Sequence, residues 1–181
     1  MRKTFIRIFT IADYENEERW LRQQHQDGWK LVNMTPPCVY TFEDCEPEDV
    51  IYRLDFKNSE QTEEYMQMVE DFGWEYFAKC MGWLYFRKPA SAVDAEGEDE
   101  LFSDGASKAE MARHIARTRL LPLLVIFLCC VLPNLLRAID GRTSGFYAFI
   151  GTFFGVMFVL YVFLLAYCGI KLTKIKNRYQ R

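Results

Sequence analysis

The sequence lacks the patterns by which most metal sites and enzymes are recognised. Its six cysteines form no CxxC pair and it contains only two histidines, so the usual ligand spacing of a zinc site is missing. No phosphate-binding loop, HExxH helix or GxSxG turn occurs. We therefore expect a protein that is not an enzyme and that holds neither a metal nor a cofactor.

A strong net charge is also missing. The chain has 22 Lys and Arg against 25 Asp and Glu, a formal charge of −3 over 181 residues. This balance argues against a nucleic-acid partner, because such proteins carry a basic surface. The first ten residues contain Arg2, Lys3 and Arg7 and do not resemble a signal peptide, which favours a cytosolic location for the soluble part.

Hydrophobic residues make up half of the chain and concentrate in its C-terminal third. Residues 120–136 and 143–170 contain no charged residue, and a polar turn separates them. Each run is long enough to cross a bilayer, the second with some tilt. The pattern predicts a transmembrane hairpin with helices over residues 119–139 and 145–172. Gly151-x-x-x-Gly155 predicts close helix packing, either with a partner helix or with the first span of the same chain.

Basic residues flank the outer ends of this predicted hairpin. Arg113, Arg117 and Arg119 precede the first span, whereas the turn carries only Arg137 and Arg142. The residues that follow the second span are Lys171, Lys174, Lys176, Arg178 and Arg181. Because cytoplasmic flanks are enriched in Lys and Arg, we expect a two-pass protein of the cell membrane with both termini in the cytoplasm.

The N-terminal half contains an internal repeat. Residues 5–43 align with residues 50–88 without a gap, so that Gly28-Trp29 falls on Gly73-Trp74 and Tyr40 falls on Tyr85. Each copy has the pattern of a strand, a helix ended by glycine, and two further strands. Two such copies predict an α+β fold over residues 1–89, a ferredoxin-like duplicated βαβ(β) domain with its helices on one face of the sheet.

The segments that flank the predicted hairpin differ in charge. Residues 90–106 read as an acidic linker, residues 107–118 as a basic juxtamembrane helix that continues into the first span, and residues 173–181 as a basic tail.

Strand alternation leaves one face of the predicted sheet without a cover. We hypothesise that this open face binds a partner, which could be an unidentified protein or a second copy of the chain. The residues assigned to the open face are Ile6, Ile8, Ile51, Arg53, Asp55 and Phe77.

Four polar residues of the N-terminal half are not assigned to a binding site. Arg7 does not fit the strand alternation and has no interpretation from the sequence. His25, which lies among glutamines, reads as a solvated side chain. Glu17 and Glu18 read as acidic residues that complement the dipole at the start of a helix.

A combination of short motifs resembles the bacterial family called domain of unknown function 2812. The motifs are Glu17-Glu18-x-Trp20-Leu21, Gly28-Trp29, Tyr40-x-Phe42, Tyr52-Arg53-Leu54, Gly73-Trp74, Tyr85-Phe86-Arg87 and Leu101-Phe102-Ser103-Asp104. The resemblance covers about residues 3–105. It implies a bacterial membrane protein with a soluble N-terminal module, and a functional link to a PadR-like transcriptional regulator. It supplies no catalytic residues.

These observations favour a membrane-anchored cytosolic module that senses or binds a protein partner, in a regulatory and non-enzymatic role. Two alternatives remain open. One is a small oligomeric transport or channel-like component, which the absence of charged residues inside the spans disfavours. The other is a dimeric small-ligand-binding domain tethered to the membrane.

Overall fold

The computed structural model describes residues 1–36, 39–56, 63–93, 101, 105–139 and 145–179. It contains two compact units, Met1–Ser107 and Lys108–Arg181, which are considered separately below. The interior of the acidic linker and the turn between the predicted spans lie outside the described residues.

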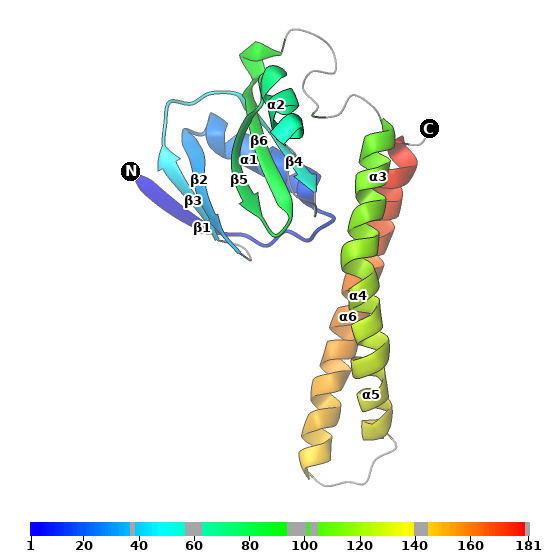
Figure 1. The fold of residues 1–181 in the computed structure, drawn as a ribbon. Helices are drawn as coiled ribbons and strands as arrows, with labels where there is room; N and C mark the ends of the chain where they lie inside the picture. The colour runs from blue at the N-terminus through cyan, green and yellow to red at the C-terminus, as the bar shows by residue number, and fades with distance from the viewer. Residues whose placement is uncertain (37–38, 57–62, 94–100, 102–104, 140–144, 180–181) are drawn as a thin grey trace. The chain divides into compact units, whose positions relative to one another are not determined.

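Within its described residues, the first unit has six strands and two α-helices (Figure 1). In chain order these are β1 (Arg2–Ile6), α1 (Tyr14–Gln26), β2 (Trp29–Thr35), β3 (Val39–Asp44), β4 (Val50–Phe56), α2 (Glu63–Asp71), β5 (Glu75–Cys80) and β6 (Trp83–Pro89), followed by the 3-10 turn η1 (Ala90–Ala92). Both halves therefore have the order β-α-β-β, and the α+β class is confirmed.

The strands form two antiparallel sheets of three strands each. The first sheet has the order β1-β3-β2 and the second has the order β4-β6-β5. This pairing differs from the single ferredoxin-like sheet that the repeat suggested. The reason is that alternation along a strand specifies which side is buried but not which strand lies beside it.

Residues with positive φ, mostly glycines, mark three of the turns between these elements. Gly28 and Gly73 end α1 and α2 with φ of 85° and 80°, a conformation in which other residues are strained. Met81 and Gly82 both have positive φ in the two-residue connection of β5 to β6, which is the geometry of a type I′ hairpin turn.

The helices cover different faces rather than one. α1 lies against β2 of the first sheet and β4 of the second, while α2 packs near β5 (Figure 1). Under α2 is an apolar cluster of Ile51, Val69, Trp74, Leu84 and Phe86. β4 and β6 are consequently buried along nearly their whole length, because both faces of the second sheet are covered.

The second unit consists of two long helical segments (Figure 1). The first runs through α3 (Gly105–Ile115), η2 (Ala116–Leu120), α4 (Leu121–Ile126), η3 (Phe127–Val131) and α5 (Leu132–Ile139) without a break. The segments η2 and η3 are π-helical and end two residues before Pro122 and Pro133. Proline lacks an N–H and clashes with the carbonyl four residues earlier, so a wider turn before it is the expected adjustment.

The other segment of the second unit is the single helix α6 (Gly145–Tyr179). Phe127 packs against Phe158 and Tyr161 of α6, with ring centroids 5.3 Å and 6.0 Å apart. Two candidate membrane spans are present, Glu110–Arg137 and Phe149–Ile175. The prediction of an α+β domain followed by two apolar helices is therefore confirmed.

Candidate functional site

Three polar side chains of α1 are buried at the junction of the two sheets. Glu17, Glu18 and His25 are 6%, 8% and 5% exposed. They share one side of the helix with Tyr14 and Leu21, since these positions recur at three and four residues. The interpretation of His25 as a solvated residue is therefore wrong. Glu17 does lie in the first turn of α1, but an interaction with the helix dipole does not account for the burial of Glu17 and Glu18.

Glu17 connects α1 to both sheets. Its Oε1 atom accepts hydrogen bonds from the hydroxyls of Tyr40 in β3, at 2.9 Å, and Tyr85 in β6, at 2.8 Å. Burial raises the pKa of Glu17, although the two hydroxyls act in the opposite direction. The pKa of Tyr85 is also raised, by burial and by the adjacent carboxylate. One carboxylate thus holds together two tyrosines that occupy equivalent places in the sequence repeat.

Glu18 provides a hydrogen-bond acceptor for the edge strand of the second sheet. Its Oε1 accepts a hydrogen bond of 2.8 Å from the backbone N–H of Leu54, and its Oε2 lies 3.6 Å from the Arg53 guanidinium. β4 is an edge strand, whose free N–H groups need a partner when they are buried. The helix supplies that partner through a side chain.

A second buried network begins at His25. Its Nδ1 lies 2.8 Å from the Tyr52 hydroxyl, and the guanidinium of Arg87 bonds Glu75 with Nε at 2.7 Å from the carboxylate. The pKa of His25 is lowered, first by burial and then by the positive charge of Arg87. Burial raises the pKa of Tyr52 to about 12, although Arg87 opposes the shift. Neutral imidazole and neutral phenol are therefore the favoured forms.

Every carboxylate, hydroxyl and imidazole described in these two networks bonds another residue of the same unit. Burial raises the pKa of the thiols of Cys45 and Cys80, which makes both poorer nucleophiles. No group of three potential metal-ligating side chains occurs among the residues that the structure describes.

A hollow of about 560 Å³ opens on the surface beside α1. Its lining residues are Arg7, Ile8, Phe9, Asp13, Asn16, Arg19, Trp20 and Gln23. The Arg7 guanidinium lies 5.0 Å from the ring centre of Trp20 and 5.1 Å from that of Phe9. Arg7 does not follow the strand alternation because β1 ends at Ile6, and beyond the strand its guanidinium packs on these two rings.

The carboxylate in this hollow accepts hydrogen bonds from its near neighbours in the sequence. Asp13 accepts hydrogen bonds from the backbone and hydroxyl of Thr10 and from the side chain of Asn16. Arg19 donates to the Asn16 side chain and to the Glu15 carbonyl. Two arginines beside an exposed aromatic edge can bind an anionic group, such as a carboxylate or phosphate.

The six residues assigned to an open face do not lie together on one open face. Ile6 and Ile8 are 77% and 79% exposed, but Ile51 and Asp55 are only 3% and 2% exposed. Ile51 belongs to the cluster beneath α2, and Asp55 accepts a 2.7 Å hydrogen bond from the Tyr65 hydroxyl.

Arg53 and Phe77 are also engaged within the first unit. Arg53 is half-buried beside Glu18. Phe77 packs edge-on against Tyr52 and Tyr85, because a bulge between Tyr76 and Ala78 turns it to the α1 side of the sheet. Ile51 and Asp55 lie under α2, whereas Arg53 and Phe77 contact residues on the α1 side, so these four cannot form a docking surface with Ile6 and Ile8.

The glycine motif of the second predicted span has open space on one side. A methyl group placed on Gly155 would meet no atom within 4 Å. Close packing of the first span at Gly155 is therefore not seen, and a partner helix at Gly151 and Gly155 stays a prediction.

The geometry defines a class of protein: an α+β unit held together by buried polar networks, joined to two helices that are apolar enough to cross a membrane. The sequence matches the family described as "Protein of unknown function (DUF2812)" over residues 13–125. Since this match covers more than half of the chain, the protein belongs to that family, as the motifs indicated. No curated protein and no solved structure matches the chain.

The sequence contained one usable signal for the buried networks. The positions 14, 17, 18, 21 and 25 form the stripe of a buried helix face, and three of them are Glu or His. Ionisable residues at such positions indicate buried partners. The identity of those partners required the tertiary structure, because they come from β3, β4 and β6.

Proposed function

We propose that this protein is a membrane-anchored, non-enzymatic binding module. In this proposal the hairpin holds the protein in the bilayer, and the α+β unit presents the hollow at Arg7 and Arg19 to an anionic group of a protein partner. Both termini face the cytoplasm, in keeping with the basic flanks of the two spans.

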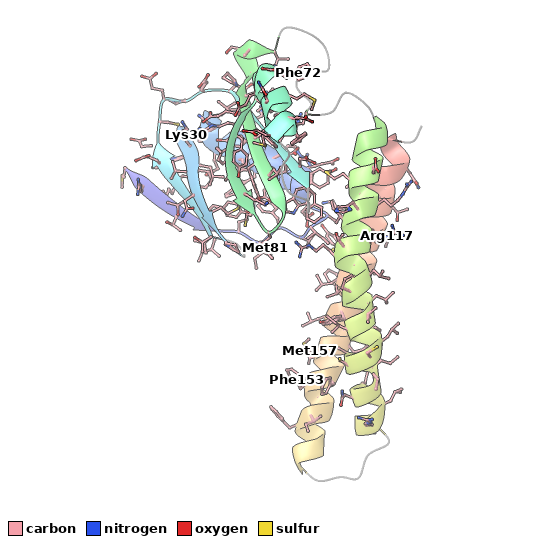
Figure 2. The ribbon with its side chains drawn as sticks, viewed as in Figure 1. Lys30, Phe72, Met81, Arg117, Phe153 and Met157 are labelled. Carbon is pink, nitrogen blue, oxygen red and sulfur yellow. The ribbon has the colours of Figure 1, made fainter. Side chains whose placement is uncertain are left out.

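The observation that carries the proposal is the exposure of the apolar helices. In the most hydrophobic 18-residue window of each span, only 11% and 0% of the residues are buried. Phe153 projects from α6 and is 54% exposed (Figure 2), and Val159 and Phe163 are 66% and 64% exposed. Water does not tolerate so large an apolar surface, whereas lipid does.

A binding role is supported by how the ionisable groups of the α+β unit are used. The buried carboxylates and His25 are each bonded to other residues of the unit, as expected for groups that stabilise the fold. The exposed cations of the hollow, Arg7 and Arg19, lie on a rigid helix and an adjoining strand end. Such a site can recognise a partner without transforming it.

Membrane anchoring is tested by fractionation of the full-length chain. We expect wild-type protein to resist extraction at alkaline pH, and the double variant Val159→Asp/Phe163→Asp to be released, because two charges in a span oppose insertion. The control is Ile6→Asp, which introduces one aspartate in place of an exposed apolar residue outside the hairpin. Release of the wild-type protein by alkaline extraction alone would contradict anchoring.

Partner binding is tested by site-specific photocrosslinking in membranes. A photoreactive residue at position 23, which lines the hollow, should give an adduct that a probe at the exposed position 79 does not give. The adduct should disappear in Arg7→Glu/Arg19→Glu and persist in Arg2→Glu, an exposed arginine outside the hollow. An adduct that is unchanged by the double reversal of charge would reject the hollow as the binding site.

A further inference from the structure

A second hollow, shallow and wide open, runs along one face of α6 at the end of the uncharged stretch, and we call it the α6 groove. Its volume is about 680 Å³, and its lining residues all belong to this one helix: Leu165, Ala166, Gly169, Ile170, Thr173, Lys174 and Asn177. The charge-free part of α6 ends at Ile170, and Lys171 is the first charged residue after it. The groove therefore crosses the boundary between an apolar helix surface and a basic one.

The composition of the groove changes along its length. Leu165, Ala166 and Ile170 form its apolar end, and Lys174 and Asn177 contribute to its polar end. The lining extends from Leu165 to Asn177, twelve steps along the helix, which is about 18 Å at 1.5 Å per step. This length accommodates a phospholipid headgroup together with the upper part of its acyl chains.

Gly169 keeps the middle of the groove open. A methyl group added there would meet no atom within 4 Å, so the space above this glycine is unfilled. The Thr173 hydroxyl donates a 2.8 Å hydrogen bond back to the Gly169 carbonyl, which directs the polar group toward the helix backbone. The Gly169 carbonyl in the middle of the groove is thus hydrogen-bonded by a side chain.

The groove lies on a different side of α6 from the side that packs within the unit. The packed side is marked by Cys168, Leu172 and Ile175, which are 4%, 3% and 3% exposed. Successive residues are rotated by about 100° around a helix, so Gly169 and Thr173 point away from that side. The groove is consequently accessible to lipid when α6 spans a bilayer.

The surrounding charge favours an anion. At this end of the two helices the described residues include five basic side chains and one acidic side chain, Glu110. The basic residues are Arg113, Arg117, Arg119, Lys171 and Lys174. Lys171 lies over the Tyr167 ring at 5.8 Å, and Arg117 is exposed on the first helical segment (Figure 2). A basic surface next to an apolar one is complementary to an anionic phospholipid.

We propose that the α6 groove binds one anionic phospholipid, with its headgroup at Lys174 and Asn177 and its acyl chains along Leu165, Ala166 and Ile170. The inference rests on the proposed membrane anchoring, because the ligand comes from the bilayer. It adds a specific lipid site to what would otherwise be a passive anchor.

The test is native mass spectrometry of the full-length protein, incubated with an equimolar mixture of phosphatidylglycerol and phosphatidylcholine. Wild-type protein should retain one phosphatidylglycerol in preference to phosphatidylcholine. Lys174→Gln should lower this preference about fivefold, the factor that corresponds to about 1 kcal/mol per basic residue near an anionic surface. Gly169→Leu should abolish retention of the bound lipid, because the side chain fills the groove.

The matched control is Arg113→Gln, which removes one exposed positive charge from the same end of the unit but outside the groove. It should leave the preference unchanged. An equal loss in Arg113→Gln and Lys174→Gln would overturn the proposal in favour of a diffuse charge effect. Displacement of the retained lipid by inorganic phosphate would overturn it in favour of a headgroup-only anion site.

A second copy of the chain is the competing occupant, because Gly169 and Thr173 have the spacing of a helix-packing motif. If Gly169→Leu dissociates a dimer while lipid retention is unaffected, the groove is a protein interface and the proposal fails. Failure of anchoring is distinguished by the alkaline extraction described above. A protein that resists extraction but shows no preference between the two lipids refutes the lipid site alone.

Discussion

The bond network at Glu17 leads to a quantitative prediction about two substitutions of this residue. Oε1 of Glu17 accepts both tyrosine hydroxyls, and Tyr40 and Tyr85 are each only 3% exposed. Glu17→Ala removes the acceptor from both hydroxyls, and each buried group left without a partner costs about 1–3 kcal/mol. We expect Glu17→Ala to lower the free energy of unfolding by about 2–6 kcal/mol.

Glu17→Gln should behave differently because glutamine keeps a carbonyl oxygen that can accept both hydroxyls. Burial raises the pKa of Glu17 above its ordinary value of 4.5, so the folded protein binds the proton more tightly than the unfolded chain. The stability that this group contributes is therefore complete at acidic pH and declines as the pH rises through the folded-state pKa. Glutamine resembles the protonated form, so this variant should gain stability relative to wild type between about pH 4.5 and pH 7.

The assay is denaturant unfolding of the full-length protein in detergent, followed by tryptophan fluorescence. All four tryptophans, at positions 20, 29, 74 and 83, lie in the α+β unit, so the signal reports that unit alone. The reasoning is refuted if Glu17→Gln is as destabilised as Glu17→Ala at pH 7. It is also refuted if the difference between Glu17→Gln and wild type does not change over this pH range.

Three further outcomes are expected in the same assay. Ile51→Asp should unfold the unit, since it buries a charge beneath α2, whereas Ile6→Asp should change stability by less than about 0.5 kcal/mol; equal effects would contradict the assignment of faces. Gly28→Ala and Gly73→Ala should each lower the free energy of unfolding by at least about 1 kcal/mol, because φ is positive at both positions. The loss should be larger for Gly28→Ala, because its methyl group would lie 3.1 Å from the backbone oxygen of Cys45, whereas that of Gly73→Ala would lie 3.5 Å from the Lys88 side chain. Because the pKa of His25 is lowered, the contribution of His25 to stability should decline as the pH drops below 6.5, so the difference in stability between wild type and His25→Gln should change over this range; a constant difference would count against a neutral buried imidazole.

Local features of the fold were predictable from the sequence because they depend on neighbouring residues. Gly28 and Gly73 end their helices with positive φ, and Met81-Gly82 forms the hairpin turn, as their residue types indicate. The two apolar helices were equally clear, since a charge-free run of sufficient length has few other stable environments. The family was also identifiable, through the combination of short motifs.

The candidate site was less predictable because its parts come from distant segments. The pattern assigned Ile6 and Ile51 to the same open face, but Ile51 is covered by α2 and Ile6 is exposed. Arg7 does not fit the alternation because β1 ends at Ile6, and its guanidinium lies beside the rings of Phe9 and Trp20. Neither relation follows from spacing along one strand.

The sequence by itself determined the local elements, the α+β class and the division into a polar unit and an apolar hairpin. These follow from short-range sterics and from the partition of side chains between water and apolar surroundings. Only the tertiary structure decided that the strands form two sheets and that α1, with Glu17, Glu18 and His25, lies at their junction. The physical reason is that a buried carboxylate or imidazole is tolerated only with specific partners, and those partners are brought within bonding distance by the chain's long-range packing.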